Sequence, residues 1–200
     1  MTTWTSSNFI GGHPVLDFVN TAGGRTRARD VERLTRWRDA LEWAVRAGVL
    51  DGTGAARLRG DAGTAEGERA IGDLRAQREA LHAYLMAIVE DAEPPADARE
   101  RVEADIRAAY AHARLSALPN RSAPWDIGVG TAGFGVLGGR IALLSNELLL
   151  GPERAQIRLC GACSWMYLDP SPSGRRRWCS MATCGNRAKA RRHYDRARRV

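Results

Sequence analysis

Apolar side chains recur at helical spacing through most of the first 150 residues. The clearest stripe lies between residues 64 and 91 and comprises Ile71, Leu74, Leu81, Leu85 and Ile88. Charged residues fill the opposite face of that segment, as in a helix that packs one side on a core. The same spacing over 30–47, 96–116 and 141–150 predicts further helices, so we expect four or five helices around one core.

The segments between these helices are less regular. The apolar run within residues 15–19 fits either a short strand or one buried turn of helix. Asp30 is a candidate N-cap for the second helix, and the four glycines of 51–63 predict a loop. Between 120 and 139, apolar residues alternate with glycines, which fits either two short strands or an irregular loop.

The last fifty residues follow a different pattern. Ser164–Asp169 has the composition of a strand, Pro170 begins a turn, and Arg175–Trp178 can return as a second strand. Alanine and arginine after Cys184 favour a final helix, for which Asn186 is a suitable N-cap. This order predicts a small hairpin followed by a helix.

The chain shows no secretory signal at its start and no apolar stretch of the roughly 20 residues that a membrane span needs. We therefore expect a cytoplasmic protein without membrane contact. Thiols stay reduced in that compartment, so clustered cysteines there favour a metal over a disulfide.

All four cysteines of the chain lie close together near its end: Cys160, Cys163, Cys179 and Cys184. They form a Cys-x2-Cys pair, fifteen intervening residues and a Cys-x4-Cys pair. Four thiolates suit the tetrahedral coordination of Zn²⁺ and leave no open position for catalysis. The spacing predicts one structural zinc ion, and a module of this size needs the metal to fold.

Together these patterns predict a mainly α fold. A helical body with a few short strands is expected at 1–151. A small four-cysteine module of the zinc-ribbon type, ending in a basic helix, is expected at 152–200.

Charge is concentrated in the second part. Residues 1–150 hold 18 Arg and 20 acidic residues, a net of −2, whereas 151–200 hold 12 Lys plus Arg and 3 acidic residues, a net of +9. A cationic surface of this kind gains free energy from counterion release on DNA. The alternative is a solvated charge run. The candidate nucleic-acid-binding residues are Arg175, Arg176, Arg177, Arg187, Lys189, Arg191, Arg192 and Arg196.

Three polar residues interrupt the apolar opening segment, namely His13, Asp17 and Asn20. Residues of this type can line a pocket for a small-molecule effector, or they can form a buried hydrogen-bond network. No nucleophile–base pair accompanies them, so the sequence does not indicate an enzyme.

At this level of detail the chain resembles a known family. Cys184-Gly185-Asn186-Arg187 is the motif for which the CGNR zinc finger is named, and Gly11–Thr21 is similar to the opening of the ABATE domain. That domain precedes the finger in bacterial proteins described as stress-induced transcription regulators. The resemblance implies a four-cysteine zinc site and a DNA partner.

Two functions are compatible with these observations. In the first, the finger binds DNA and the helical body senses an effector or forms a homodimer. In the second, the module is a protein-interaction surface without direct DNA binding, and its anchors are Trp165, Tyr167 and Trp178.

Overall fold

A computed structural model describes residues 2–60, 64–115, 125–171 and 173–198. Its helices are α1 (Pro14–Val19), α2 (Trp37–Arg46), α3 (Gly52–Arg59), α4 (Ala65–Glu90), α5 (Ala96–His112), α6 (Val129–Ala132), α7 (Val136–Leu150) and α8 (Asn186–Ala197). Its strands are β1 (Arg114–Leu115), β2 (Trp125–Asp126), β3 (Ile157–Leu159) and β4 (Met166–Leu168). The predicted mainly α fold is confirmed.

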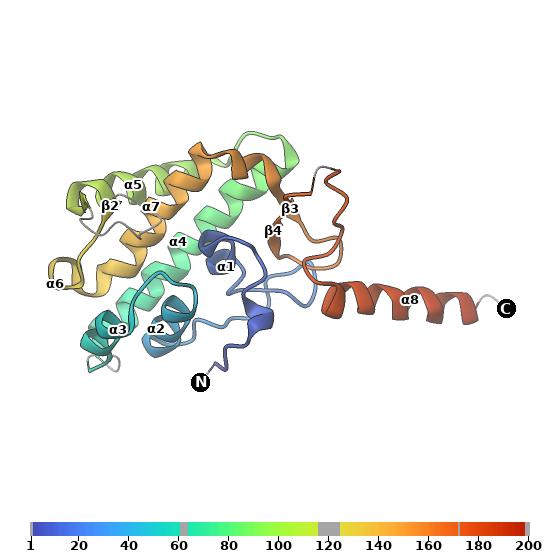
Figure 1. Cartoon of the computed structure of the whole chain (residues 1–200), viewed down its shortest axis with the longest axis horizontal. Helices are drawn as coiled ribbons and strands as arrows, with labels where there is room; N and C mark the ends of the chain where they lie inside the picture. Colours follow the sequence, from blue (N-terminus) through green and yellow to red (C-terminus); the bar gives the residue numbers. More distant parts are fainter. Residues whose placement is uncertain (1, 61–63, 116–124, 172, 199–200) are drawn as a thin grey trace.

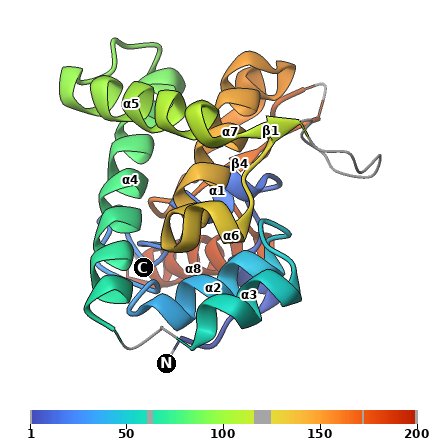
Figure 2. The ribbon, with the colours of Figure 1, turned by 90° about the vertical axis from the view of Figure 1, so that its left-hand side faces the viewer.

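The long helix α4 is the main structural element of the helical body. Helices α5 and α7 pack against it and against each other, α2 and α3 lie near its start, and α1 lies between α4 and α7 (Figures 1 and 2). The four-cysteine module expected at 152–200 follows α7, and its helix α8 extends away from the rest of the molecule (Figure 1). The chain therefore ends in a helix that projects from a packed body.

The apolar run at residues 15–19 is part of helix α1 and is not a strand. His13 caps it by accepting a hydrogen bond from the amide of Val15, and Pro14 occupies the first helical position, where its missing amide costs nothing. Val15, Leu16, Phe18 and Val19 are all buried because α4, α7 and β4 surround this helix. Burial on every side explains why apolar residues point in all directions from this helix, and Asp17 among them is buried too.

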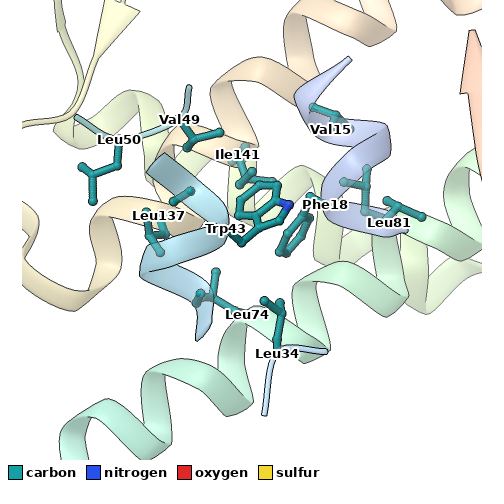
Figure 3. Packing of buried hydrophobic residues seen from close by; sticks show 14 of the residues in the cluster. Val15, Phe18, Leu34, Trp43, Val49, Leu50, Leu74, Leu81, Leu137 and Ile141 are labelled. Atoms are coloured by element: carbon teal, nitrogen blue, oxygen red, sulfur yellow. The ribbon is translucent and has the colours of Figure 1, made fainter. Parts of the chain in front are cut away.

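Trp43 occupies the centre of the hydrophobic core. Its ring lies 5.4 Å from that of Phe18, measured between centroids, and only 1% of the residue is exposed. Figure 3 shows aliphatic side chains from α4 and α7 around it, including Leu74, Leu137 and Ile141. The core thus joins the first helix of the chain to the last helix of the body.

Two predictions for residues 30–63 were wrong. Asp30 does not cap a helix, because a backbone bridge between Ala22 and Glu32 keeps this stretch extended and α2 starts only at Trp37. The expected loop at 51–63 contains α3. There the Asp51 carboxylate caps the helix by accepting the amide of Gly54 at 2.6 Å, and two apolar side chains are buried.

The glycine-rich segment combines both alternatives left open for it. β2 pairs antiparallel with β1, and a short helix and a 3-10 turn follow. Helix α7 starts at Val136, five residues earlier than the predicted Ile141, because Val136 and Leu137 are already buried. Residues 120–124 of this prediction lie outside the described residues.

The segment Val129–Leu150 is long and apolar enough to cross a membrane by length and composition, contrary to the expectation from sequence. In the fold, α7 packs against α1, α4 and α5, and Arg140 donates to the backbone carbonyls of Val49 and Ile127. Core packing therefore explains the hydropathy of this helix.

The predicted hairpin was wrong in its second strand. β4 pairs antiparallel with β3, which precedes the first cysteine pair, with Ile157 opposite Leu168. Residues 175–178 form no strand in the part of the chain that the structure describes. Met166 and Ile157 are buried in the core of the body, so the pairing that buries both is favoured.

The final helix also starts differently. A π-type turn at Met181–Gly185 leads directly into α8, and Asn186 is helical, with its side chain donating to the carbonyl of Ala182. Asn186 is therefore inside a helical segment and does not cap it. Cys184 lies on this turn, which accounts for the four-residue gap in the second cysteine pair.

Candidate metal centre and basic groove

The sulfur atoms of the four cysteines converge on one point. All four lie within 4.8 Å of one another, and three of the separations are 3.5, 3.6 and 3.7 Å. A tetrahedron of sulfurs at about 2.3 Å from zinc has edges of about 3.8 Å. Each cysteine is at most 1% exposed. The centre therefore fits one structural zinc ion, as predicted from the spacing.

Ionising all four thiols at this spacing would also need a cation beside them. Hydrogen bonds from neighbouring sulfurs lower the pKa of Cys160, because they stabilise its thiolate. The same contacts raise the pKa of Cys163 to about 12 and raise that of Cys179, because a second thiolate beside the first is disfavoured and burial adds a desolvation cost. Four thiolates can share this volume only with a positive ion among them.

The first cysteine pair is held by close backbone packing. The amide of Gly161 donates to the carbonyl of Arg177 at 2.9 Å, and a Cβ at Gly161 would lie 2.9 Å from the Trp178 ring. The guanidinium of Arg176 lies over the Tyr167 ring and donates to the carbonyls of Trp178 and Leu168. These contacts take the place of the missing strand pairing.

Arg187 connects the metal centre to the body. One of its nitrogens lies 2.9 Å from the sulfur of Cys184, and the guanidinium also donates to the carbonyls of Gly24 and Arg25. The hydrogen bond to Cys184 raises the pKa of Arg187, because the thiolate stabilises the cation. This arginine therefore offsets thiolate charge and anchors the 22–29 loop at the same time.

Asn20 pairs with the second strand of the module. Its amide group donates to the carbonyl of Met166 at 2.8 Å and accepts from the amide of the same residue at 2.9 Å. The side chain is 1% exposed. Asn20 thus satisfies the backbone of β4, 146 residues away in sequence.

His13 and Asp17 also contact backbone. His13 caps α1, and Asp17 accepts the amide of Gly11 at 2.8 Å. Burial raises the pKa of Asp17 to about 6. None of the three predicted pocket residues lines the cavities of about 610, 490 and 390 Å³ in the described part of the chain. Their contacts match the hydrogen-bond network that was the alternative to an effector pocket.

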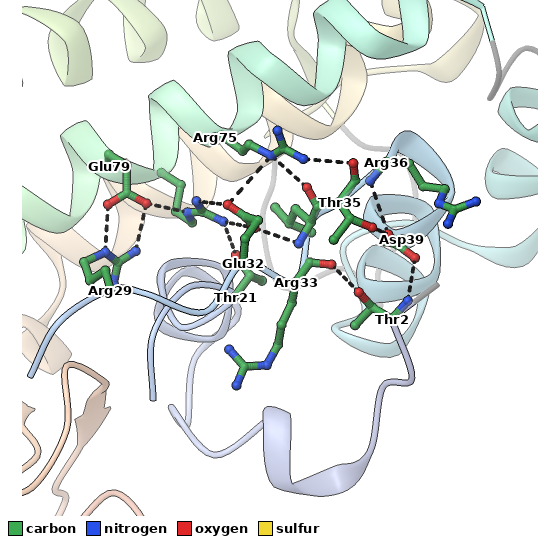
Figure 4. A network of polar contacts seen from close by, with 12 residues as sticks. Thr2, Thr21, Arg29, Glu32, Arg33, Thr35, Arg36, Asp39, Arg75 and Glu79 are labelled. Atoms are coloured by element: carbon green, nitrogen blue, oxygen red, sulfur yellow. Dashed lines mark hydrogen bonds and ion pairs between the residues drawn. The ribbon is translucent and has the colours of Figure 1, made fainter. Parts of the chain in front are cut away.

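A network of ion pairs fixes the loop that Arg187 anchors. Arg78 is 3% exposed and forms two hydrogen bonds to the carboxylate of Glu32, at 2.8 and 2.6 Å. Arg29 forms two to Glu79, and Arg78 donates to the hydroxyl of Thr21, which joins both ends of the loop to α4 (Figure 4). Although burial alone would raise it, pairing with Arg29 and Arg78 lowers the pKa of Glu79 to about 2.

A groove of about 390 Å³ lies beside the metal centre, between the 22–29 loop and α8. We call it the basic groove. It is lined by six arginines, one tryptophan and three small residues: Arg25, Arg27, Gly161, Ala162, Arg177, Trp178, Arg187, Ala188, Arg191 and Arg192. No carboxylate is among these lining residues. Its walls come from the body, the cysteine knuckle and the final helix.

The predicted nucleic-acid-binding residues divide into three groups. Four line the basic groove: Arg177, Arg187, Arg191 and Arg192. Arg176 is turned inward onto Tyr167. Lys189 and Arg196 lie about half a turn from Arg187 around α8, and Arg175 is exposed outside the groove.

Sequence reasoning missed Arg25 and Arg27. They lie in a stretch rich in glycine and arginine, at residues 22–29. The signal was the local density of charge, with four arginines in 25–33 on odd positions and acidic residues only at 30 and 32. The sequence does not link this loop to the module, because the residues of the two segments that contact each other are far apart in the chain.

The proposed aromatic anchors are mostly interior. Trp165 is 7% exposed and donates its indole N–H to the carbonyl of Ala22, and Tyr167 is 1% exposed. Of the three, only Trp178 is partly exposed, and it lines the basic groove. Two of the three residues therefore stabilise the module rather than present a surface.

Comparison with protein families agrees with this geometry. Residues 12–152 match the ABATE family, described as "Putative stress-induced transcription regulator". Residues 156–197 match the CGNR zinc finger. Both resemblances noted in the sequence are confirmed. No curated relative matches the chain.

Proposed function

The chain belongs to the ABATE family of transcription regulators and carries a CGNR zinc finger, and from that membership we propose that it binds duplex DNA through its C-terminal module. The observation that carries the proposal is α8. This basic helix has no buried residue and extends from the body (Figure 1). A helix with no packing face of its own is available to a partner, and its charge suits phosphate.

Zinc has a structural part in this proposal. Cys160, Cys163, Cys179 and Cys184 would hold the ion, which when bound supplies a tetrahedral cross-link between the cysteine knuckle and the start of the final helix. The chain's own contribution is to place Arg177 and Arg191 on the same side of that cross-link.

The proposed role of the helical body is less specific. The division into 1–151 and 152–200 stays a prediction, and Met166 of the module lies in the core of the body. A homodimer and a small-molecule effector are likewise proposals. For an effector, a cavity of about 610 Å³ bordered by α4, α5 and α7 is a better candidate than the predicted residues of α1. Asp73 and Phe134 are among its lining residues, which suits a ligand with polar and apolar parts.

We propose a regulatory role without catalytic activity, because the family description names a transcription regulator. The proposal includes a cytoplasmic location, because a bacterial regulator meets its DNA there.

The test is a fluorescence-anisotropy titration of a labelled duplex against the zinc-loaded chain, repeated between 50 and 300 mM salt. The four arginines of the module that line the groove would by themselves contribute about −3.6 to the slope of log K against log salt, so the slope should be at least that steep. Arg191→Gln with Arg192→Gln should make the slope less steep by about 1.8, whereas Arg57→Gln with Arg59→Gln on α3 should leave it unchanged. The control arginines are exposed and lie away from the groove.

Two results would contradict the proposal. The first is no binding even at the lowest salt. The second is binding to an acidic protein that excess duplex does not displace, which would favour the protein-interaction alternative with Trp178 as its remaining anchor.

A further inference from the structure

The loop at residues 22–29 is part of the body, yet its backbone is fixed to the metal module. Gly23 and Gly24 have positive φ values of 74° and 97°, which turn the chain sharply beside Trp165. The amide of Ser164 donates to the carbonyl of Thr26 at 2.9 Å, next to the ligand Cys163. The loop therefore follows the cysteine knuckle closely.

The loop is held from three sides. Arg187 of α8 donates to the carbonyls of Gly24 and Arg25, and the indole of Trp165 donates to that of Ala22. On the far side, Arg29 is paired with Glu79 of α4 (Figure 4). Because backbone atoms make most of these contacts, they place the loop without engaging the side chains between them.

Those side chains belong to Arg25 and Arg27. Both are exposed and both line the basic groove opposite α8. Among the described residues, neither has an ion-pair partner, whereas Arg29 of the same loop pairs with Glu79, and Arg33 just beyond the loop lies over the Trp165 ring. The loop thus separates arginines that stabilise the fold from arginines that face the groove.

The two walls of the groove carry like charge at close range. Arg25 and Arg27 face Arg187, Arg191 and Arg192 with no carboxylate lining the space between them. Repulsion of this kind opposes the folded state and is relieved by a polyanion. Proteins that insert a helix into DNA commonly use a second element to grip the adjacent phosphates.

We propose that the 22–29 loop of the body is the second half of the DNA interface, in which Arg25 and Arg27 bind backbone phosphates of the duplex that α8 engages. This inference rests on the proposed DNA binding. It makes the body a direct part of the binding surface rather than only a sensor joined to it. The finger by itself would hold only one wall of the groove.

The experiment uses the zinc-loaded full chain and the same labelled duplex. Arg25→Gln with Arg27→Gln removes two phosphate contacts and leaves the backbone carbonyl that Arg187 uses. The salt slope should become less steep by about 1.8, and affinity at 0.1 M salt should fall about 60-fold. Arg25→Lys with Arg27→Lys keeps the charge and should restore most of the slope. Arg57→Gln with Arg59→Gln is the charge-matched control.

Zinc content and the thermal unfolding midpoint show whether each variant is folded. The inference is overturned if the loop variant retains the slope of the unsubstituted chain while Arg191→Gln with Arg192→Gln loses it, and DNA binding itself then stands. It is also overturned if the α3 control lowers the slope as much as the loop variant. Absence of binding by the unsubstituted chain at low salt overturns both proposals together.

Discussion

Replacing Asn20 with alanine breaks the connection between the first helix and the metal module. The side chain makes two hydrogen bonds to the backbone of Met166 in a site that is 1% exposed. Alanine leaves the buried amide and the buried carbonyl of Met166 without these partners. Each unsatisfied group costs about 1–3 kcal/mol. We therefore expect the free energy of unfolding to fall by about 3 kcal/mol.

The assay is urea unfolding of the zinc-loaded chain, followed by circular dichroism. In a thermal melt of a chain of this size, the same loss of stability should lower the midpoint of unfolding by about 6–12 °C. Asn20→Asp keeps the acceptor but places a carboxylate against the carbonyl of Met166, so it should cost at least as much. Asn146→Ala is the matched control, because Asn146 makes one exposed hydrogen bond, to Tyr110, and should change stability by less than about 0.5 kcal/mol.

A loss below about 1 kcal/mol for Asn20→Ala, or a loss equal to that of Asn146→Ala, would refute this reasoning. It would mean that β4 is held by its pairing with β3 alone, and that the contact to α1 is incidental.

Three further predictions concern the metal, the loop and pH. Chelation of zinc should abolish DNA binding and lower the helical circular dichroism signal, and added zinc should restore both. Gly24→Ala should destabilise the chain in urea and weaken DNA binding, because φ is 97° and the new Cβ would lie 2.4 Å from the Trp165 ring, whereas Gly60→Ala has open space and should be neutral. The pKa of Glu79 falls from 4.5 to about 2 in the folded chain, so its pairing stabilises the fold above pH 4.5 and is lost as pH falls towards 2. The free energy of unfolding, measured between pH 4.5 and pH 2, should fall less steeply with pH in Glu79→Gln than in the unsubstituted chain. An identical pH dependence in the two proteins would show that the pair does not contribute.

Local patterns in the sequence determined the longest helix and the metal centre. The apolar stripe of 64–91 predicts α4 because helical periodicity is a property of neighbouring residues, and the Thr64 cap agrees with it. The four cysteines predict the zinc site for a similar reason, since two short spacings place the ligands in pairs. The final basic helix also follows from local composition. These features need no knowledge of the rest of the chain.

Tertiary structure decided the partners of each local element. The strand at 166–168 pairs with Ile157–Leu159 instead of Arg175–Trp178, because this choice buries Ile157 and Met166 in the core of the body. The hydrogen-bond partners of Asn20 and Arg187 likewise lie far from them in the sequence. Periodicity and spacing report which face of an element is apolar, but burial and hydrogen-bond satisfaction choose what covers it. For that reason the sequence alone indicated a basic helix, and only the fold brought the 22–29 loop beside it to form a groove.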